Sequence, residues 1–252
     1  MLVVILGTTR QTMKIYLGLI LFCLLSCQNR QERNVASNNS DSIQKVQTET
    51  IPKDTVQLEE VFIDSLNIGR KKFNKIEVSQ YRATDSVYVD MKFYTKQTDK
   101  WTLNQTIHFL KDGISSCDAK LNDFNNDRQN DLTIVSSTAA RGANEVRSLF
   151  IYDKLSDKLI EMKNSKKYPN MLYNKELKCI DAFLVYGGSS TVFLRISGDS
   201  LKEFASVQAM DGVTVREYDK NGKEKIISQD TTNKAGYIRF KTYKPLKEYD
   251  DY

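Results

Sequence analysis

The chain is 252 residues long, which allows one β domain of ordinary size together with terminal tails. Hydrophobic residues make up 40% of it and charged residues 27%, and together with a total of three prolines this composition argues against general disorder. The net charge of +5 is mild, and no block of Lys and Arg is interleaved with aromatic residues, so we expect no binding to nucleic acid.

Residues 1–27 have the pattern of a bacterial lipoprotein signal. Met13 is the better start, because a lysine follows it directly and the apolar run Ile15–Leu25 comes next. This run is too short to cross a bilayer as a helix. It ends in the letters LLSC, which resemble a lipobox, so we expect a lipid on Cys27; an ordinary secretory signal that contains a cysteine is the alternative. Gln28, in place of aspartate, favours the outer membrane, on its periplasmic or its surface face.

Residues 28–55 are predicted to form a flexible tether. The segment is polar and has few large apolar side chains, so it cannot bury enough surface to offset the entropy lost on ordering. A tether of this kind lets an anchored domain stand away from the membrane. The remaining residues, 56–252, are expected to form a single domain.

From residue 56 onward, apolar and polar residues alternate in short runs rich in Val, Ile, Tyr and Phe, which is typical of β-strands. Turns are expected at 97–100, at 153–157 and at 219–222, where Gly222 can adopt positive φ. The strands are predicted at Lys75–Gln80, Ser86–Thr95, Trp101–Leu110, Leu132–Ser137, Val146–Tyr152, Lys158–Met162, Cys179–Tyr186, Thr191–Ile196, Leu201–Ala209, Val213–Tyr218, Lys223–Ser228 and Tyr237–Tyr243.

These strands recur about every ten residues, with turn residues between them. Outside the signal, only the piece near 170–176 is expected to form a helical turn. We therefore predict an all-β fold of antiparallel strands, arranged as a sandwich, a barrel or a partial propeller. The acidic loop described next occurs once, so sequence periodicity does not favour the propeller.

The stretch Leu121–Val135 carries oxygen-bearing side chains at alternate positions, followed by an apolar run. This spacing suits a hard cation such as Ca²⁺. Carboxylates so close together repel one another unless something neutralises them, so the alternative is an Asx-rich turn satisfied by its own backbone hydrogen bonds. The candidate ligands are Asp123, Asn125, Asp127, Gln129 through its carbonyl, and Asp131.

Two positions of this loop depart from an EF-hand. Arg128 stands where the sharp turn normally needs Gly, and positive φ costs a non-Gly residue roughly 1 kcal/mol. Ile134 stands where an EF-hand has its bidentate Glu. These departures exclude an ordinary EF-hand, and the cation at Arg128 predicts weak calcium binding.

The letters DFNNDRQNDLTIV resemble the D-x-N-x-D-G-x-x-D-[LI] loop of FG-GAP/VCBS-type β-proteins, with Arg128 departing from the pattern. Over roughly residues 111–207, the order of segments is similar to single-copy calcium-loop lipoproteins related to immunity proteins against type IV-secreted peptidoglycan hydrolases. The most specific parts are the acidic loop, the pair Pro169-Asn170 and the run Tyr186-Gly187-Gly188. The resemblance implies that the partner is a peptidoglycan-cleaving hydrolase and that this chain inhibits it.

The run YGGSSTVF is the best candidate for a recognition surface. Its two glycines permit a tight turn or the close approach of a partner, and its tyrosine is of the type enriched at interfaces. An ordinary hairpin turn is the alternative. The residues concerned are Tyr186, Gly187, Gly188, Ser189, Ser190 and Thr191.

Two cysteines remain for the mature domain, Cys117 and Cys179. They could form one disulfide in an oxidising compartment, or could be two buried free thiols at separate core positions. His108 is the single histidine, and neither a nucleophile motif nor a phosphate-binding glycine loop accompanies it. A pair of hydrolytic carboxylates needs no local motif and is the alternative, but the acidic residues fall mostly in turns beside Lys and Asn, so we expect no enzyme activity.

Three functions remain open from the residues and the resemblance. The first is a non-enzymatic envelope lipoprotein that binds and inhibits a peptidoglycan hydrolase. The second is a glycan- or envelope-binding module in which tyrosines and Trp101 stack on sugars. The third is a structural accessory lipoprotein. The oligomeric state is not predicted.

Overall fold

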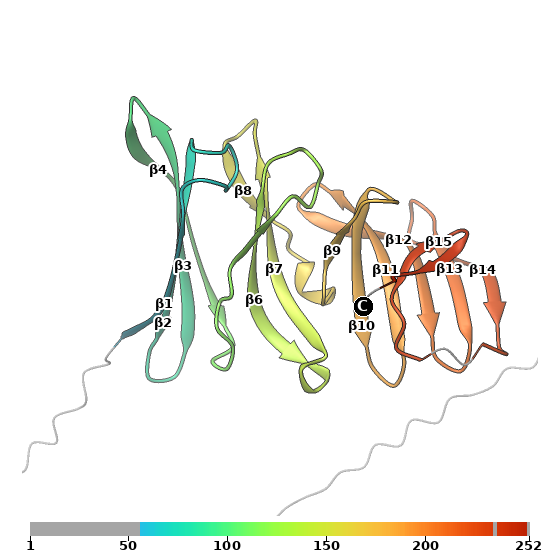
Figure 1. The fold of residues 1–252 in the computed structure, drawn as a ribbon. Coiled ribbons are helices and arrows are strands. Elements are labelled where there is room, and N and C mark those ends of the chain that lie inside the picture. Colours follow the sequence, from blue (N-terminus) through green and yellow to red (C-terminus); the bar gives the residue numbers. More distant parts are fainter. Residues whose placement is uncertain (1–55, 234–235, 251–252) are drawn as a thin grey trace, which may run out of the picture. The chain divides into compact units, whose positions relative to one another are not determined.

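The computed structural model describes residues 56–233 and 236–250 (Figure 1). The signal, Cys27 and the tether all lie outside the described residues. The described part is all-β and holds four antiparallel sheets, none of which closes into a barrel. A sandwich-like arrangement fits, so the predicted fold class is confirmed and its barrel alternative is excluded for these residues.

Each sheet is built from strands that follow one another in the chain. The first sheet contains β1 (Gln57–Asp64), β2 (Asn74–Arg82), β3 (Val87–Gln97) and β4 (Lys100–Lys111). The second contains β5 (Lys120–Asn122), β6 (Asp131–Ala139), β7 (Asn144–Asp153) and β8 (Lys158–Glu161). The third contains β9 (Leu172–Asn174), β10 (Cys179–Val185), β11 (Ser189–Ser197), β12 (Ser200–Ala209), β13 (Val213–Tyr218) and β14 (Glu224–Asp230). The fourth is the hairpin of β15 (Phe240–Tyr243) and β16 (Leu246–Glu248).

The helices of the described part are two short 3₁₀ turns, η1 (Ala140–Gly142) and η2 (Ser165–Lys167). No described helix has the length and apolar character needed to cross a membrane. The helical turn expected near 170–176 is wrong, because Leu172–Asn174 instead forms the edge strand β9, paired with β10. Only three residues pair there, too few for the alternation of a strand to show in the sequence.

The second sheet is buried on both faces. On β7, Phe150 and Tyr152 point into a first core shared with the first sheet, whereas Leu149 and Ile151 point into a second core shared with the third sheet. A strand covered on both faces reads as a continuous apolar run. This burial explains the unbroken apolar letters LFIY of β7, in contrast to the alternating β2 and β3.

The third sheet is likewise covered on both faces. On β11, Val192 and Leu194 belong to the second core, and Phe193 belongs to a third core that includes Phe240 of β15. The hairpin β15–β16 therefore closes the far side of this sheet. The first sheet contributes to one core only, through alternating buried residues of β2 and β3.

Asp157 joins the first two sheets by hydrogen bonds. It lies in the turn between β7 and β8, with φ of 54°, and its carboxylate accepts from Thr95 Oγ1 at 2.5 Å and from Asn74 Nδ2 at 3.0 Å. The Tyr152 hydroxyl donates to the same carboxylate at 2.7 Å. These donors hold the pKa of Asp157 below its usual value despite the burial that opposes them. The turn predicted at 153–157 is thus also a cross-sheet contact.

Candidate functional site

The acidic loop runs from β5 into β6, and the two strands pair as a hairpin with Asn122 opposite Asp131. Asn126 and Arg128 take positive φ, at 61° and 70°. The sequence predicts positive φ at position 128, where Gly is usual. Arg128 adopts this conformation although its Cβ makes positive φ less favourable than it would be for Gly. The loop therefore carries local backbone strain at Arg128.

The loop's side-chain oxygens accept hydrogen bonds from its own backbone. Asp123 Oδ2 accepts from the N–H of Arg128 at 2.8 Å, and Asp127 Oδ1 accepts from that of Gln129 at 2.8 Å. The side chain of Asn125 accepts from the N–H of Asp127 at 3.1 Å. In this form the loop matches the Asx-turn alternative, in which N–H groups balance the carboxylates.

Whether Ca²⁺ also binds stays a prediction. Within 56–233 and 236–250, no group of three or more His, Cys, Asp and Glu side chains is close enough to hold a metal ion. A cation would have to compete with the N–H donors for Asp123 and Asp127. The oxygen-rich composition suits calcium, and the neighbouring guanidinium of Arg128 opposes it.

Asp131 is the one fully buried candidate ligand, with an exposed fraction of 0%. Its two oxygens accept from the backbone N–H of Phe124 at 2.8 Å and of Tyr152 at 2.9 Å. Burial raises the pKa of Asp131 to about 7, with the charges of Asp127 and Asp123 acting in the same direction and the two N–H donors opposing it. Asp131 therefore fastens the loop to β7.

Of the six predicted recognition residues, the structure exposes two and buries four, Gly188 among the buried ones. Tyr186 and Gly187 are exposed in the turn between β10 and β11. Ser189, Ser190 and Thr191 are buried on β11, with exposed fractions of 0%, 9% and 0%. The Thr191 hydroxyl accepts the N–H of Phe240 at 2.9 Å, and the Ser189 hydroxyl donates to Ile238 O at 3.3 Å.

The prediction that these three hydroxyls face a partner is corrected, because β11 lies inside the third sheet and is covered by the residues leading into β15. The hydroxyls of Ser189 and Thr191 satisfy backbone groups of that segment instead.

Gly187 and Gly188 of this turn line a cleft of about 330 Å³, together with residues that the sequence did not single out. Met210 after β12 and Tyr237 before β15 are 46% and 65% exposed at the same end of the sheet. Gly188 is required here, since a Cβ on it would lie 2.5 Å from Ala209 O. We name Tyr186, Gly187, Met210 and Tyr237 the end cluster. Pairing of β11 with β12, which is not visible in local sequence, brings it together.

The cysteines are two buried free thiols, so the disulfide alternative is wrong. Cys117 belongs to the first core and Cys179 to the third, with the second sheet and the second core between them. Burial raises the pKa of Cys117 to about 11 and that of Cys179 to about 12. Neither is a thiolate at neutral pH.

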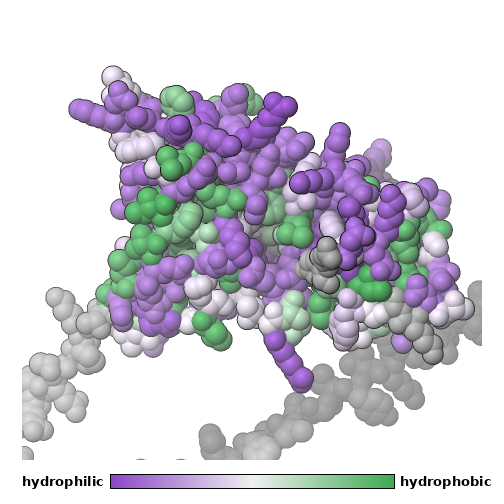
Figure 2. Space-filling model, in the orientation of Figure 1, coloured by the Kyte–Doolittle hydropathy of each residue, from purple (hydrophilic) through white to green (hydrophobic). Residues whose placement is uncertain are grey.

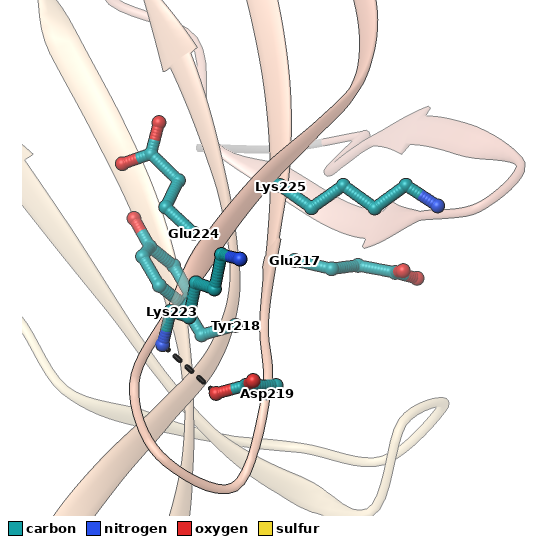
Figure 3. Close-up of a pocket in the computed structure, with 6 residues that line it drawn as sticks. All are labelled: Glu217, Tyr218, Asp219, Lys223, Glu224 and Lys225. Atoms are coloured by element: carbon teal, nitrogen blue, oxygen red, sulfur yellow. Dashed lines mark hydrogen bonds between the residues drawn. The ribbon is translucent and has the colours of Figure 1, made fainter.

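A second cleft, of about 440 Å³, lies at the β13–β14 hairpin and is lined mainly by charged residues (Figure 3). The Lys223 N–H donates to Asp219 at 2.9 Å. Figure 3 shows the carboxylates of Glu217, Asp219 and Glu224 pointing in three different directions. They do not converge on one point, as a pair of hydrolytic carboxylates must.

His108 lies on β4, and its Nδ1 is 2.6 Å from Asp90 Oδ1 on the neighbouring strand. The imidazole also contacts the Tyr88 ring, with 5.1 Å between centroids. Its side chain is 58% exposed, on the outward face of the first sheet. These contacts place His108 in a surface ladder of cross-strand pairs.

Comparison with known proteins adds no assignment: no protein-family model matches the chain, and no curated protein matches it in sequence.

Proposed function

We propose that this chain is a non-enzymatic lipoprotein of the bacterial cell envelope that binds another protein through the end cluster. The observation that supports this most is the exposure of Met210 and Tyr237 around one cleft, which Gly187 also lines, with exposed Tyr186 next to Gly187 in the same turn. Tyrosine and methionine are enriched at protein interfaces, because they offer large apolar area with few constraints on the partner. Singly scattered apolar residues would need no such explanation.

The proposed partner is a peptidoglycan hydrolase, which this chain inhibits. The similarity of the acidic loop and of Tyr186-Gly187-Gly188 to immunity-type lipoproteins supports this choice of partner. The exposed Tyr186 and Gly187, which carries no side chain, would enter the glycan cleft of the enzyme. A lipid on Cys27 would hold the inhibitor at the outer membrane, where the hydrolase acts on the cell wall.

In this proposal the acidic loop has a supporting role. Asp131 fastens it to β7, and β7 packs through Leu149 and Ile151 against the third sheet, which carries the end cluster. Ca²⁺, if bound, would stiffen the same connection by adding ligands across the loop.

The test is binding and inhibition with a panel of lysozyme-like hydrolases, using the chain from Gln28 onward. Tyr186→Ala and Tyr237→Ala should each weaken binding about tenfold or more, the size expected of a central aromatic contact. Leu155→Ala, at a position 97% exposed in the β7–β8 turn, is the matched control and should leave binding unchanged. Absence of any complex with the panel would refute the hydrolase proposal. Glycan binding by the same material would select the sugar-binding alternative.

A further inference from the structure

The first sheet has a face that none of the three cores covers along any of its four strands. Strands of the second and third sheets, such as β7 and β11, are covered on both sides by cores, whereas the first sheet contributes only its inward residues to a core. We call the outward side of β1–β4 the open face. Sheets with an uncovered face normally present polar residues there.

The open face instead carries large exposed apolar residues on both of its edge strands. Leu58 and Ile63 of β1 are 51% and 59% exposed, and Leu103 and Leu110 of β4 are 51% and 64% exposed. Val61 adds to the β1 edge. Hydrophobic surface is visible in Figure 2 on the side where β1–β4 lies in Figure 1. Large exposed apolar patches with polar groups among them mark interaction sites.

The two middle strands carry rings and opposite charges. Strand pairing places Tyr81 of β2 beside Tyr88 of β3, with their rings stacked at 5.2 Å. It also places Glu77 of β2 beside Lys92 of β3. Across the sheet, Leu58, Tyr81, Tyr88 and Leu110 therefore form one row, and Ile63, Glu77, Lys92 and Thr106 form another.

We propose that the open face binds the open face of a second copy of this chain, about a two-fold axis parallel to the strands. Such an axis places β1 of one copy against β4 of its partner and β2 against the partner's β3. Each cross-sheet row then faces the same row of the partner. Leucine then meets leucine at both edges, through Leu58 and Leu110. Glu77 meets the partner's Lys92, and that contact occurs twice in the dimer. Packing of two sheets nearly in line is one of the two common geometries.

The distribution of charge favours this axis over the alternative. A two-fold axis across the strands at the row of Glu77 and Lys92 would set each of these residues against its own copy. Like charges facing one another at an interface are strongly unfavourable. The mixed signs of Glu77, Asp90, Lys75 and Lys92 also fit a second copy better than an anionic membrane surface, which attracts clusters of one sign.

The position of the chain start agrees with the same axis. The described chain enters the first sheet at Val56, directly before β1. An axis parallel to the strands places Val56 of both copies at the same end of the dimer. If Cys27 carries the proposed lipid, both tethers can reach one membrane, where confinement raises the effective concentration of each copy for the other.

The test is sedimentation velocity of the chain from Gln28 onward over a wide range of concentrations, with hydrolase binding measured in parallel. Wild type should show a concentration-dependent dimer. Lys92→Glu should raise the dimer dissociation constant at least about tenfold, since it opposes two like charges at each of two contacts. The double variant Glu77→Lys/Lys92→Glu should restore dimerisation, because it exchanges the charges and keeps the pair. Lys154→Glu, in the exposed β7–β8 turn, controls for net charge and should have no effect.

A wild-type chain that stays monomeric at every concentration would overturn the dimer. So would a dimer that Lys92→Glu leaves intact, or one that the double variant fails to restore. Because the end cluster lies on the third sheet and the open face on the first, loss of dimerisation with unchanged hydrolase binding would separate the two proposals. All variants are on exposed or half-buried surface positions, and a melting curve identifies any that fails to fold.

Discussion

At the scale of single residues, Arg128 combines two unfavourable features at one position. Its φ of 70° is strained for a residue with a Cβ, and it brings a positive charge into the loop that holds Asp123 and Asp127. Both features oppose calcium, the first by loosening the loop and the second by charge. A single substitution can remove both.

Arg128→Gly should therefore increase the response to Ca²⁺. We expect the melting temperature of wild type to rise slightly with Ca²⁺ and to fall with chelator, and the difference to be larger in the variant. A gain of about 1 kcal/mol corresponds to roughly 2–4 °C in a domain of this size. Asp127→Ala should abolish the difference. If none of the three proteins responds to Ca²⁺, the loop is held by its Asx hydrogen bonds alone.

The two thiols should be unreactive in the folded chain. With pKa values of about 11 and about 12, Cys117 and Cys179 are almost entirely protonated at pH 7, and both side chains are buried. A thiol reagent added to the chain from Gln28 onward should label them only at the rate of unfolding. In denaturant both should react at once. Rapid labelling of either thiol under native conditions would contradict the placement of that cysteine in a core.

At the scale of elements, β15 is attached to the third sheet by polar contacts as well as by Phe240. Arg239 and Asp181 form an ion pair in which both side chains are 0% exposed, with Arg239 Nε donating to Asp181 Oδ1 at 2.8 Å. Asn174 Nδ2 also donates to Asp181, at 2.9 Å. Burial of an ion pair carries a desolvation free energy that offsets much of the attraction between its charges. We therefore assign this pair the role of fixing the position at which the hairpin packs, rather than a large contribution to stability.

Thr191→Val should show how much one of these contacts contributes. The change leaves the buried N–H of Phe240 without its acceptor, and we expect a loss of about 1–3 kcal/mol in the free energy of unfolding. Denaturant titration measures this loss. Thr102→Val, at an exposed position on β4, is the control and should change stability by less than about 0.5 kcal/mol. Equal effects of the two changes would show that the Thr191 bond does not hold β15.

At the scale of the whole described molecule, three cores are joined by strands that contribute to two of them. β7 serves the first and second cores, and β11 serves the second and third. If one core is disrupted, a strand that it shares with the adjacent core loses its packing on one face, and the adjacent core is weakened as well. The sheets should therefore unfold together, although each is a local meander.

The single tryptophan allows this cooperativity to be measured. Trp101 lies on β4 in the first sheet, whereas far-ultraviolet circular dichroism reports all sheets. Urea transitions followed by Trp101 fluorescence and by circular dichroism should coincide. Asp157→Ala should lower both midpoints together, because it removes the acceptor that joins the first two sheets. A separate early fluorescence transition would mean that the first sheet unfolds independently.

Much of the strand pattern follows from the sequence because it is local. Alternation along β2 and β3, and the glycine in the β13–β14 turn, are properties of neighbouring residues and suffice to place those elements. β1 and the three-residue strands β5, β9 and β16 are missed, because their strand state comes from pairing with a neighbour rather than from their own letters.

By itself, the sequence determined the all-β class, most strands and the position of the acidic loop. Only the tertiary structure decided that Ser189–Thr191 are buried, that Cys117 and Cys179 lie in different cores, and that the first sheet keeps an open face. The physical reason is that each face of a strand is buried only where another sheet packs against it. That stacking joins residues far apart in the chain, so no local pattern records it.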